Sequence, residues 1–319
     1  MLMMTLLTGS VLPMFGVVEL EAATFAGFGA TTPGGSGGTV VHVTNLKDAG
    51  LGSLRDALSQ GNRHIVFDVA GVIELKSRLD VKGAHITIDG FSALLPGITL
   101  KNYGLRIPGK DGAHNVIVQG IRVRITSKQP GGVDGITVGS GAYNVVIDHV
   151  SVCCASDENL SITGGAHDVT VSWSILAKPI TGHNTNLLIS NGASRISIHH
   201  NLFVKALQRN PWVAYSTELL PAPEIQADVR NNLMWEVGGN GVANVTDPVS
   251  TGEMNHGTVV LNGGTANIVN NYYKAISTND ADIQRRVIVV CKDENAPEDQ
   301  PFCEERVPAS SPAAGVYVA

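Results

Sequence analysis

Three oxygen-bearing side chains stand side by side at Asp157, Glu158 and Asn159, directly before a short apolar stretch. Asp134, in the earlier stretch GGVDGITV, adds a further carboxylate. Carboxylate and amide oxygens are the ligands that hard cations such as Ca²⁺ prefer in proteins. The run therefore predicts the beginning of a cation site, although an isolated run of this kind also suits a solvated turn.

The elements that must position these side chains are short strands. Residues 144–153 alternate apolar and polar side chains, as does a strand that is buried on one face. Similar stretches recur between residues 40 and 275. We match their apolar positions as Ile86, Val116, Val145, Val169, Ile196, Val229 and Ile268.

This recurrence predicts an all-β solenoid, a right-handed single-stranded parallel β-helix, in which each repeat stacks on its neighbour. Asn side chains at 231–232 and 270–271 should then hydrogen-bond between neighbouring coils. A short amphipathic helix over residues 53–60, with Ser53 as its N-cap, is expected to cover the N-terminal end. A β-sandwich is the alternative for so many short strands.

Composition agrees with a β-rich protein, because Gly is abundant (36 residues) while aromatic residues make up 5% and charged residues 16%. A net charge of −6 and a pI near 5.9 argue against a nucleic-acid partner. Residues 1–23 resemble a signal peptide, which predicts a secreted or periplasmic protein. No later stretch is long enough for a membrane span, so we expect no membrane partner, and we expect a monomer. The solenoid should occupy residues 24–275, and residues 276–319 should cover its C-terminal end.

The four cysteines fall into two pairs. Cys291 and Cys303 bracket a polar loop that a disulfide would close. Cys153 and Cys154 are adjacent, so on a strand they should point to opposite faces, which predicts at least one buried thiol.

Seven stretches in order resemble the pectate lyases, a polysaccharide lyase family, over residues 25–275. They are GGTVVHVTNLKDAGLGSLRDAL, VVIDHVSV, DENLS, VTVSWSI, ISIHHNLF, RNP and NIVNNYY. The resemblance implies a parallel β-helix that cleaves an acidic polysaccharide, polygalacturonate or a related polyuronate, by Ca²⁺-assisted β-elimination.

The resemblance also assigns roles to residues. Asp134 and Asp157 match acidic positions that hold Ca²⁺, and Glu158 lies beside them. Arg209, in QRNPW, matches the arginine taken as the base, although arginine normally stays protonated. Ser161 stands where many family members carry another Asp.

Substrate contacts are expected from residues that follow these motifs. Lys178, the second candidate catalytic residue, lies a few positions from the basic residue that usually follows VTVSW, and we expect it to bind a substrate carboxylate. Lys205 and His183 are alternatives for this binding. Trp212 suits either stacking on a sugar or core packing. The family commonly has a second Arg past the RNP turn, where this chain has Trp212, Val213 and Ala214.

Two other functions are compatible with these residues. One is a polygalacturonase-type hydrolase, with acidic residues around a water molecule. The other is a non-catalytic β-helix that binds carbohydrate. The adjacent Asp148 and His149 suggest acid–base chemistry, but strand neighbours point to opposite faces, so we expect a structural role for them. The same holds for His199 and His200.

Overall fold

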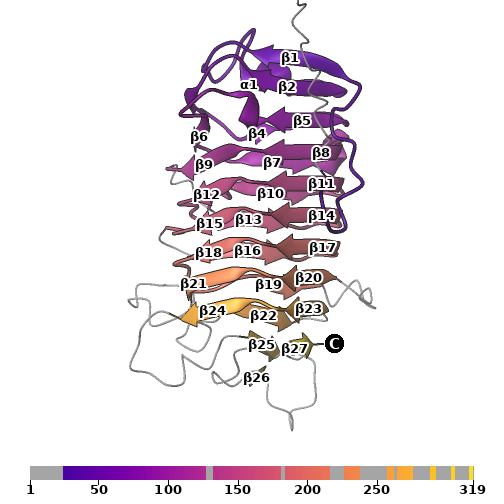
Figure 1. Cartoon of the computed structure of the whole chain (residues 1–319), viewed down its shortest axis with the longest axis vertical. Helices are drawn as coiled ribbons and strands as arrows, with labels where there is room; N and C mark the ends of the chain where they lie inside the picture. Colours follow the sequence, from indigo (N-terminus) through magenta and orange to yellow (C-terminus); the bar gives the residue numbers. More distant parts are fainter. Residues whose placement is uncertain are drawn as a thin grey trace, which may run out of the picture.

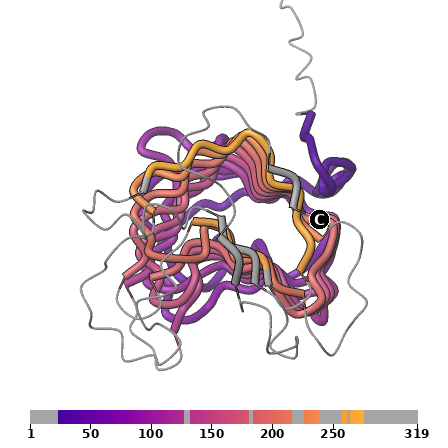
Figure 2. The backbone as a smooth tube through the Cα atoms, turned by 90° about the horizontal axis from the view of Figure 1, so that it is seen from below, coloured from indigo at the N-terminus to yellow at the C-terminus, as the bar shows by residue number. Residues whose placement is uncertain are grey.

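The chain winds into an all-β parallel solenoid with almost no helix (Figure 1). The computed structural model describes residues 24–126, 132–180, 184–215, 226–237, 257–261, 264–275, 288–291, 303–305 and 316–318. Viewed along the long axis, the successive coils superimpose (Figure 2). The predicted signal peptide lies outside the described residues. None of the described helices has the length and apolar character to cross a membrane.

Each full coil adds one strand to each of three sheets, here called sheets I, II and III in chain order. Sheet I contains β1 (Thr39–Val43), β2 (Arg63–Phe67), β5 (Ile86–Asp89), β8 (His114–Gln119), β11 (Tyr143–Asp148), β14 (His167–Ser172), β17 (Ser194–His199), β20 (Ala227–Arg230), β23 (Ala266–Val269) and β27 (Val316–Val318). Sheet II contains β3 (Gly71–Glu74), β6 (Ile98–Asn102), β9 (Ile121–Ile125), β12 (Ser151–Cys153), β15 (Ile175–Ala177), β18 (Leu202–Val204), β21 (Leu233–Val237) and β24 (Tyr272–Ala275).

Sheet III contains β4 (Leu79–Asp80), β7 (Leu105–Pro108), β10 (Ile136–Gly139), β13 (Glu158–Ile162), β16 (Thr185–Ile189), β19 (Trp212–Ala214), β22 (Thr258–Leu261), β25 (Ile288–Cys291) and β26 (Cys303–Glu305). The pairs β23–β27 and β25–β26 are antiparallel. The other paired strands of the described ranges run parallel, which confirms the solenoid and excludes the sandwich.

The core forms because alternate side chains of the stacked parallel strands between residues 39 and 269 point inward and stack on the same position of the next coil. The register aligns Ile86, Val116, Val145, Val169 and Ile196 as predicted, and all of these are buried. The next positions of that row are Ala227 and Ala266.

Our match of Val229 and Ile268 to this row was wrong by two residues. Val229 pairs with Ile198, and Ile268 pairs with Val229. The row of Ala227 and Ala266 and the row of Val229 and Ile268 both point inward. Because we matched the stretches by apolar character alone, we chose the larger side chains.

The predicted helix is a single turn, α1 (Leu54–Ala57), so it is shorter than expected. Ser53 caps it by accepting a hydrogen bond from the Asp56 N–H (3.2 Å), and Leu54 and Leu58 are buried. Two 3-10 turns, η1 (Gly90–Ser92) and η2 (Gly109–Asp111), follow. That α1 covers the N-terminal end stays a prediction.

An N-terminal segment, residues 26–35, crosses the outer face of sheet I before β1 begins (Figure 1). The Phe28 N–H donates to Ser197 Oγ (3.0 Å), and the Gly29 N–H donates to Thr170 Oγ1 (3.0 Å). Farther along, the Gly35 N–H donates to Thr87 Oγ1 (2.9 Å). A Cβ at Gly29 would lie 2.4 Å from the Val145 carbonyl oxygen, so only glycine fits this approach.

The predicted asparagine ladder is present where sheet I strands turn into sheet II strands. Asn201 Nδ2 donates to Asn232 Oδ1 (3.0 Å), and Asn232 Nδ2 donates to Asn271 Oδ1 (2.9 Å). Asn270 Nδ2 donates to Asn231 Oδ1 (2.6 Å). The expectation that these bends lie on neighbouring coils is confirmed.

The prediction of a buried thiol at Cys153 or Cys154 was wrong, because the two are bonded to each other and half-buried. Strand β12 ends at Cys153, and Cys154 has a φ of 72°, which breaks the alternation of faces. Cys291 and Cys303 lie opposite each other in the β25–β26 pair. A disulfide between them stays a prediction.

Candidate cation and catalytic site

The predicted site residues meet at one corner of the solenoid, where the chain passes from sheet II into sheet III. Asp134 precedes β10, Asp157 precedes β13, Glu158 is the first residue of β13, and Arg209 precedes β19. Strands β10, β13, β16 and β19 are stacked neighbours in sheet III. Stacking therefore brings residues that are far apart in sequence to the same edge of that sheet.

Three carboxylates form an acidic cluster, defined here as Asp134, Asp157 and Glu158. One oxygen from each lies within 4.8 Å of the others. Asp134 is held in place by Thr137 Oγ1, which donates to Asp134 Oδ2 (2.8 Å), and by the Glu158 N–H, which donates to Oδ1 (3.3 Å). The cluster is therefore built into the backbone of two neighbouring coils.

The electrostatics of the cluster favour a bound cation. The pKa of Asp134 is raised to about 6, chiefly by burial and also by the negative charge of Asp157, against the opposing effect of the Thr137 hydrogen bond. A divalent ion between Asp134 and Asp157 would remove their repulsion. An oxygen-only donor set of this kind fits Ca²⁺.

The third acid of the cluster also has a different partner. Glu158 Oε1 forms an ion pair with Arg209 Nη1, and Ser161 Oγ donates to Glu158 Oε2 (3.2 Å). The Glu158 side chain is only 4% exposed. Ser161, which stands where the resemblance led us to expect an acid, thus binds the carboxylate that holds Arg209.

Arg209 is fixed from several sides. Its backbone carbonyl accepts a hydrogen bond from the Leu187 N–H (2.7 Å), which ties it to β16. Its guanidinium lies over the Trp212 ring, 5.1 Å from the centroid. Trp212 thus contacts Arg209 directly, an arrangement that stabilises the cation and presents it at the cluster.

The other predicted substrate contacts are not part of the acidic cluster. Lys178 is exposed directly after β15, and Lys205 directly after β18, so both stand at the sheet II end of the connections that lead to sheet III. Lys205 Nζ pairs with Glu236 Oε2 (3.1 Å). His183 lies outside the described residues.

Sequence reasoning missed a buried amide ladder beneath the site, formed by Asn159, Asn186 and Asn210. Asn159 Nδ2 donates to Asn186 Oδ1 (2.7 Å), and Asn186 Nδ2 donates to Asn210 Oδ1 (2.7 Å). All three residues are fully buried. The available signal was an Asn directly after Glu158 and another directly after Arg209.

The pair Asp148 and His149 lies at a different corner, between sheets I and II. Our expectation that they point to opposite faces was wrong, because His149 Nδ1 lies 2.5 Å from Asp148 Oδ2. Strand β11 ends at Asp148, and His149 has a φ of 50°, which turns its ring back. His149 stacks with Trp173, which in turn stacks with His200. That this pair has a structural role stays a prediction.

The fold and the site together define a class: a parallel β-solenoid protein with a cation-compatible acidic cluster and a paired arginine at one sheet edge. Comparison with known proteins narrows it. The chain is 40% identical over 215 residues to probable pectate lyase C of Emericella nidulans, a match that covers 67% of this chain and 47% of that protein. It is 36% identical over 247 residues to probable pectate lyase C of Aspergillus terreus, covering 77% and 52%. The chain thus spans about half the length of these curated relatives.

Solved structures share the fold. Jun a 1, the major allergen from cedar pollen, superimposes with a TM-score of 0.55 at 22% identity, covering 82% of this chain and 78% of that one. A double variant of a Xanthomonas campestris pectate lyase gives 0.53 at 18% identity, covering 92% of both chains. No protein-family model matches the chain. The sequence comparisons identify the chain as a relative of the pectate lyases.

Proposed function

We propose that the protein is a secreted, monomeric, calcium-dependent pectate lyase that cleaves polygalacturonate or a related acidic polysaccharide by β-elimination. The observation that carries this proposal is the pairing of Arg209 with Glu158 at the Asp134–Asp157 cluster. The likeness to proteins named pectate lyase supports it. We further propose that the solenoid is right-handed and that α1 covers its N-terminal end.

The reaction breaks two bonds of one uronate residue. A base removes the proton from C5, the C–H electron pair becomes the C4=C5 double bond, and the C4–O bond breaks. The departing oxygen takes a proton to form the new end of the shortened chain, and the other fragment ends in an unsaturated sugar. Negative charge develops on the uronate as the C5 proton leaves, so the site must stabilise that charge.

Asp134 and Asp157 would hold the cation, with Glu158 beside them. When bound, Ca²⁺ would withdraw negative charge from the substrate's carboxylate. The protein's own side chains do the rest. Arg209, oriented by Glu158 and Trp212, takes or guides the C5 proton and stabilises the enolate charge; arginine normally stays protonated, which favours the second role.

The polyuronate is expected to lie along the corner between sheets II and III. Lys178 would bind a substrate carboxylate there and assist Arg209, and Lys205 would exchange Glu236 for the substrate. His183 is proposed as a further contact from the sequence. Trp212 would contribute the ring that supports Arg209, and any sugar stacking would use its remaining surface.

An absorbance assay on polygalacturonate tests this proposal, because the unsaturated product absorbs ultraviolet light. We expect product formation with Ca²⁺, its loss with EDTA and its return when Ca²⁺ is restored. Reducing ends without ultraviolet absorbance would instead indicate the hydrolase. Binding of polygalacturonate without cleavage of any polyuronate in a screen would indicate the non-catalytic carbohydrate binder.

A further inference from the structure

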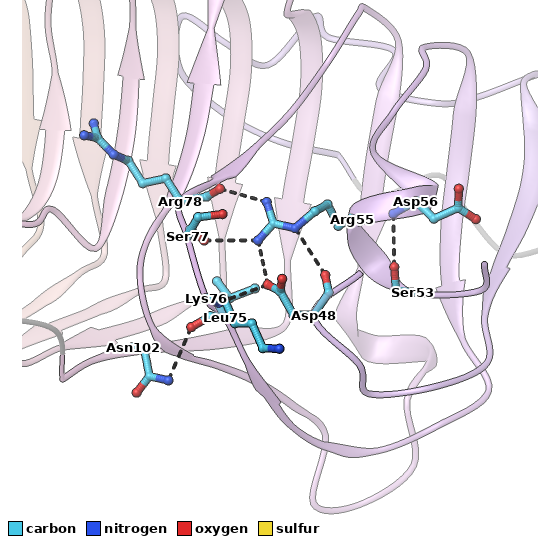
Figure 3. A network of polar contacts seen from close by, with 9 residues as sticks. All are labelled: Asp48, Ser53, Arg55, Asp56, Leu75, Lys76, Ser77, Arg78 and Asn102. Carbon is cyan, nitrogen blue, oxygen red and sulfur yellow. Dashed lines mark hydrogen bonds and ion pairs between the residues drawn. The ribbon is translucent and has the colours of Figure 1, made fainter. Parts of the chain in front are cut away.

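A polar network joins α1 to the strand that opens sheet III (Figure 3). Arg55, on α1, donates from Nη2 to Asp48 Oδ1 (2.7 Å) and to the Ser77 carbonyl oxygen (3.1 Å). Its Nη1 donates to the Arg78 carbonyl oxygen (2.8 Å). The Lys76 N–H donates to Asp48 Oδ1 (3.1 Å). Arg55 and Asp48 together thereby fix the backbone of residues 76–78 directly before β4.

The network is electrostatically strong. Burial opposes the charged form of Asp48, but the hydrogen bonds from Arg55 and the Lys76 N–H outweigh that effect, so the pKa of Asp48 lies below its usual value. The Asp48 side chain is only 14% exposed. A charge-assisted pair with little solvent access holds its geometry better than an exposed pair.

The network uses the backbone of Arg78 and leaves its side chain exposed. Figure 3 shows the Arg78 guanidinium extending away from Arg55, toward the later coils. In sheet III, β4 is followed by β7 and then by β10, which Asp134 precedes. Neighbouring strands are about 4.8 Å apart, so two coils, roughly 10 Å, separate the backbones at Arg78 and Asp134.

Arg78 directly precedes β4 and Asp134 precedes β10, so both lie at the same edge of sheet III, two strands apart. The sheet III edge therefore carries a cation, then the acidic cluster, then Arg209. This order suits a chain of regularly spaced carboxylates that runs along the solenoid axis. A protein with a net charge of −6 needs such local cations to bind a polyanion.

We propose that Arg78 binds a carboxylate of the polysaccharide at a subsite two coils before the acidic cluster, and that Arg55 and Asp48 position it. The inference rests on the proposed function for the identity of the polyanion. The guanidinium forms a bidentate pair with the uronate carboxylate, and the exposed position lets the substrate displace only water. Arg78 is a binding residue, and Arg55 is a positioning residue.

Binding and turnover should be measured separately for Arg78→Ala, with Lys110→Ala as the control. Lys110 is exposed and lies in η2, at the other end of the sheet III strand β7, so its loss removes the same charge away from the subsite. Calorimetric titration with a long oligogalacturonate should show an affinity about 10-fold lower for Arg78→Ala, the value expected when one charge-assisted pair is lost. Lys110→Ala should bind as wild type does. Arg78→Lys should recover part of the affinity.

Kinetic measurements should show a raised KM for the polymer and an unchanged kcat in Arg78→Ala. Oligomers too short to reach from the cluster to Arg78 should show no difference from wild type. In Arg55→Lys, further loss of Arg78 should cost less affinity than in wild type, because the guanidinium is no longer positioned.

Equal affinities of Arg78→Ala and Lys110→Ala for the long oligomer would overturn the subsite. The calorimetric test remains valid if the protein binds polygalacturonate without cleaving it, so failure of the proposed lyase activity is distinguishable from failure of the subsite. If the affinity losses of the Arg55 and Arg78 substitutions add fully, the positioning role of Arg55 is overturned, whereas the Arg78 subsite is not.

Discussion

The Arg209 guanidinium pairs with the Glu158 carboxylate across two steps of the sheet III stack, since Glu158 begins β13 and Arg209 precedes β19. The two residues are 51 positions apart in sequence. Glu158 is thus a member of the acidic cluster and also the ion-pair partner of Arg209. A cation at Asp134 and Asp157 and a guanidinium at Glu158 would together place two positive charges beside the substrate's carboxylate.

Replacement of Arg209 by Lys keeps the charge and removes the planar fork that pairs with Glu158. We expect kcat to fall by about 100-fold or more, as for loss of a group that stabilises transition-state charge, with a much smaller change in KM. Initial rates of ultraviolet-absorbing product on polygalacturonate measure both. A folded Arg209→Lys protein with near wild-type turnover would remove Arg209 from the catalytic machinery.

Asp157 and Glu158 should respond differently to substitution. Asp157→Ala should sharply raise the calcium concentration needed for half-maximal activity. Asp134 and Asp157 are the two proposed calcium ligands, and this variant removes one of them. Glu158→Gln should chiefly lower kcat and destabilise the fold by about 2 kcal/mol, because it leaves the Arg209 charge without its partner. Calcium titrations of activity and urea unfolding of both variants distinguish these roles. Identical calcium requirements in the two variants would contradict the separation.

The solenoid was predictable because inward-facing side chains repeat from coil to coil, as Val116, Val145 and Val169 do. Joint placement of Asp134 and Asp157 followed from the same stacking. The two residues themselves were chosen from the resemblance to the pectate lyases, and each lies within two residues of the start of a sheet III strand. The register failed at Val229 and Ile268, because a strand of period two has two inward rows and composition does not choose between them.

Side-chain partners beyond stacking were not predictable. The Arg209–Glu158 pair and the Arg55 contacts with residues 77 and 78 depend on where long side chains extend, which a repeat pattern does not specify. The alternation of faces did not hold at His149 and Cys154. Each of these residues comes directly after the last residue of a strand, and each has a positive φ. Local backbone turns therefore decided where these side chains point.

The raised pKa of Asp134 makes the stability of the metal-free protein depend on pH. The usual pKa of 3.8 rises to about 6 in the folded chain, so between these values the folded state binds more protons than the unfolded state. The free energy of unfolding should therefore fall as pH rises from about 4 to 6. Asp134→Asn removes this penalty, and at pH 7 with EDTA it should be about 1–3 kcal/mol more stable than wild type.

Urea unfolding at a series of pH values tests this expectation, with Asp111→Asn, an exposed carboxylate in η2, as the control. The stability gain of Asp134→Asn should vanish below about pH 4, where both states hold the proton. Calcium should stabilise wild type at pH 7 more than at pH 5, since it must displace the Asp134 proton at the lower pH. A pH-independent difference between Asp134→Asn and wild type would contradict the raised pKa.

The buried amide ladder should connect stability to catalysis at the site. Asn186 joins Asn159, next to Glu158, to Asn210, next to Arg209, so Asn186→Leu breaks both hydrogen bonds that tie these coils together. The other ladder supplies a control, because Asn232 likewise joins two amides, the buried Asn201 and the half-buried Asn271, at a corner away from the site. Each Leu variant leaves buried polar groups unsatisfied and should lose about 2–4 kcal/mol of unfolding free energy.

At a temperature where both variants are folded, only Asn186→Leu should show a lower kcat, by about 10-fold, because the Arg209–Glu158 geometry loosens. Equal kcat values for the two variants, at equal loss of stability, would show that the ladder beneath the site stabilises the fold without positioning the arginine.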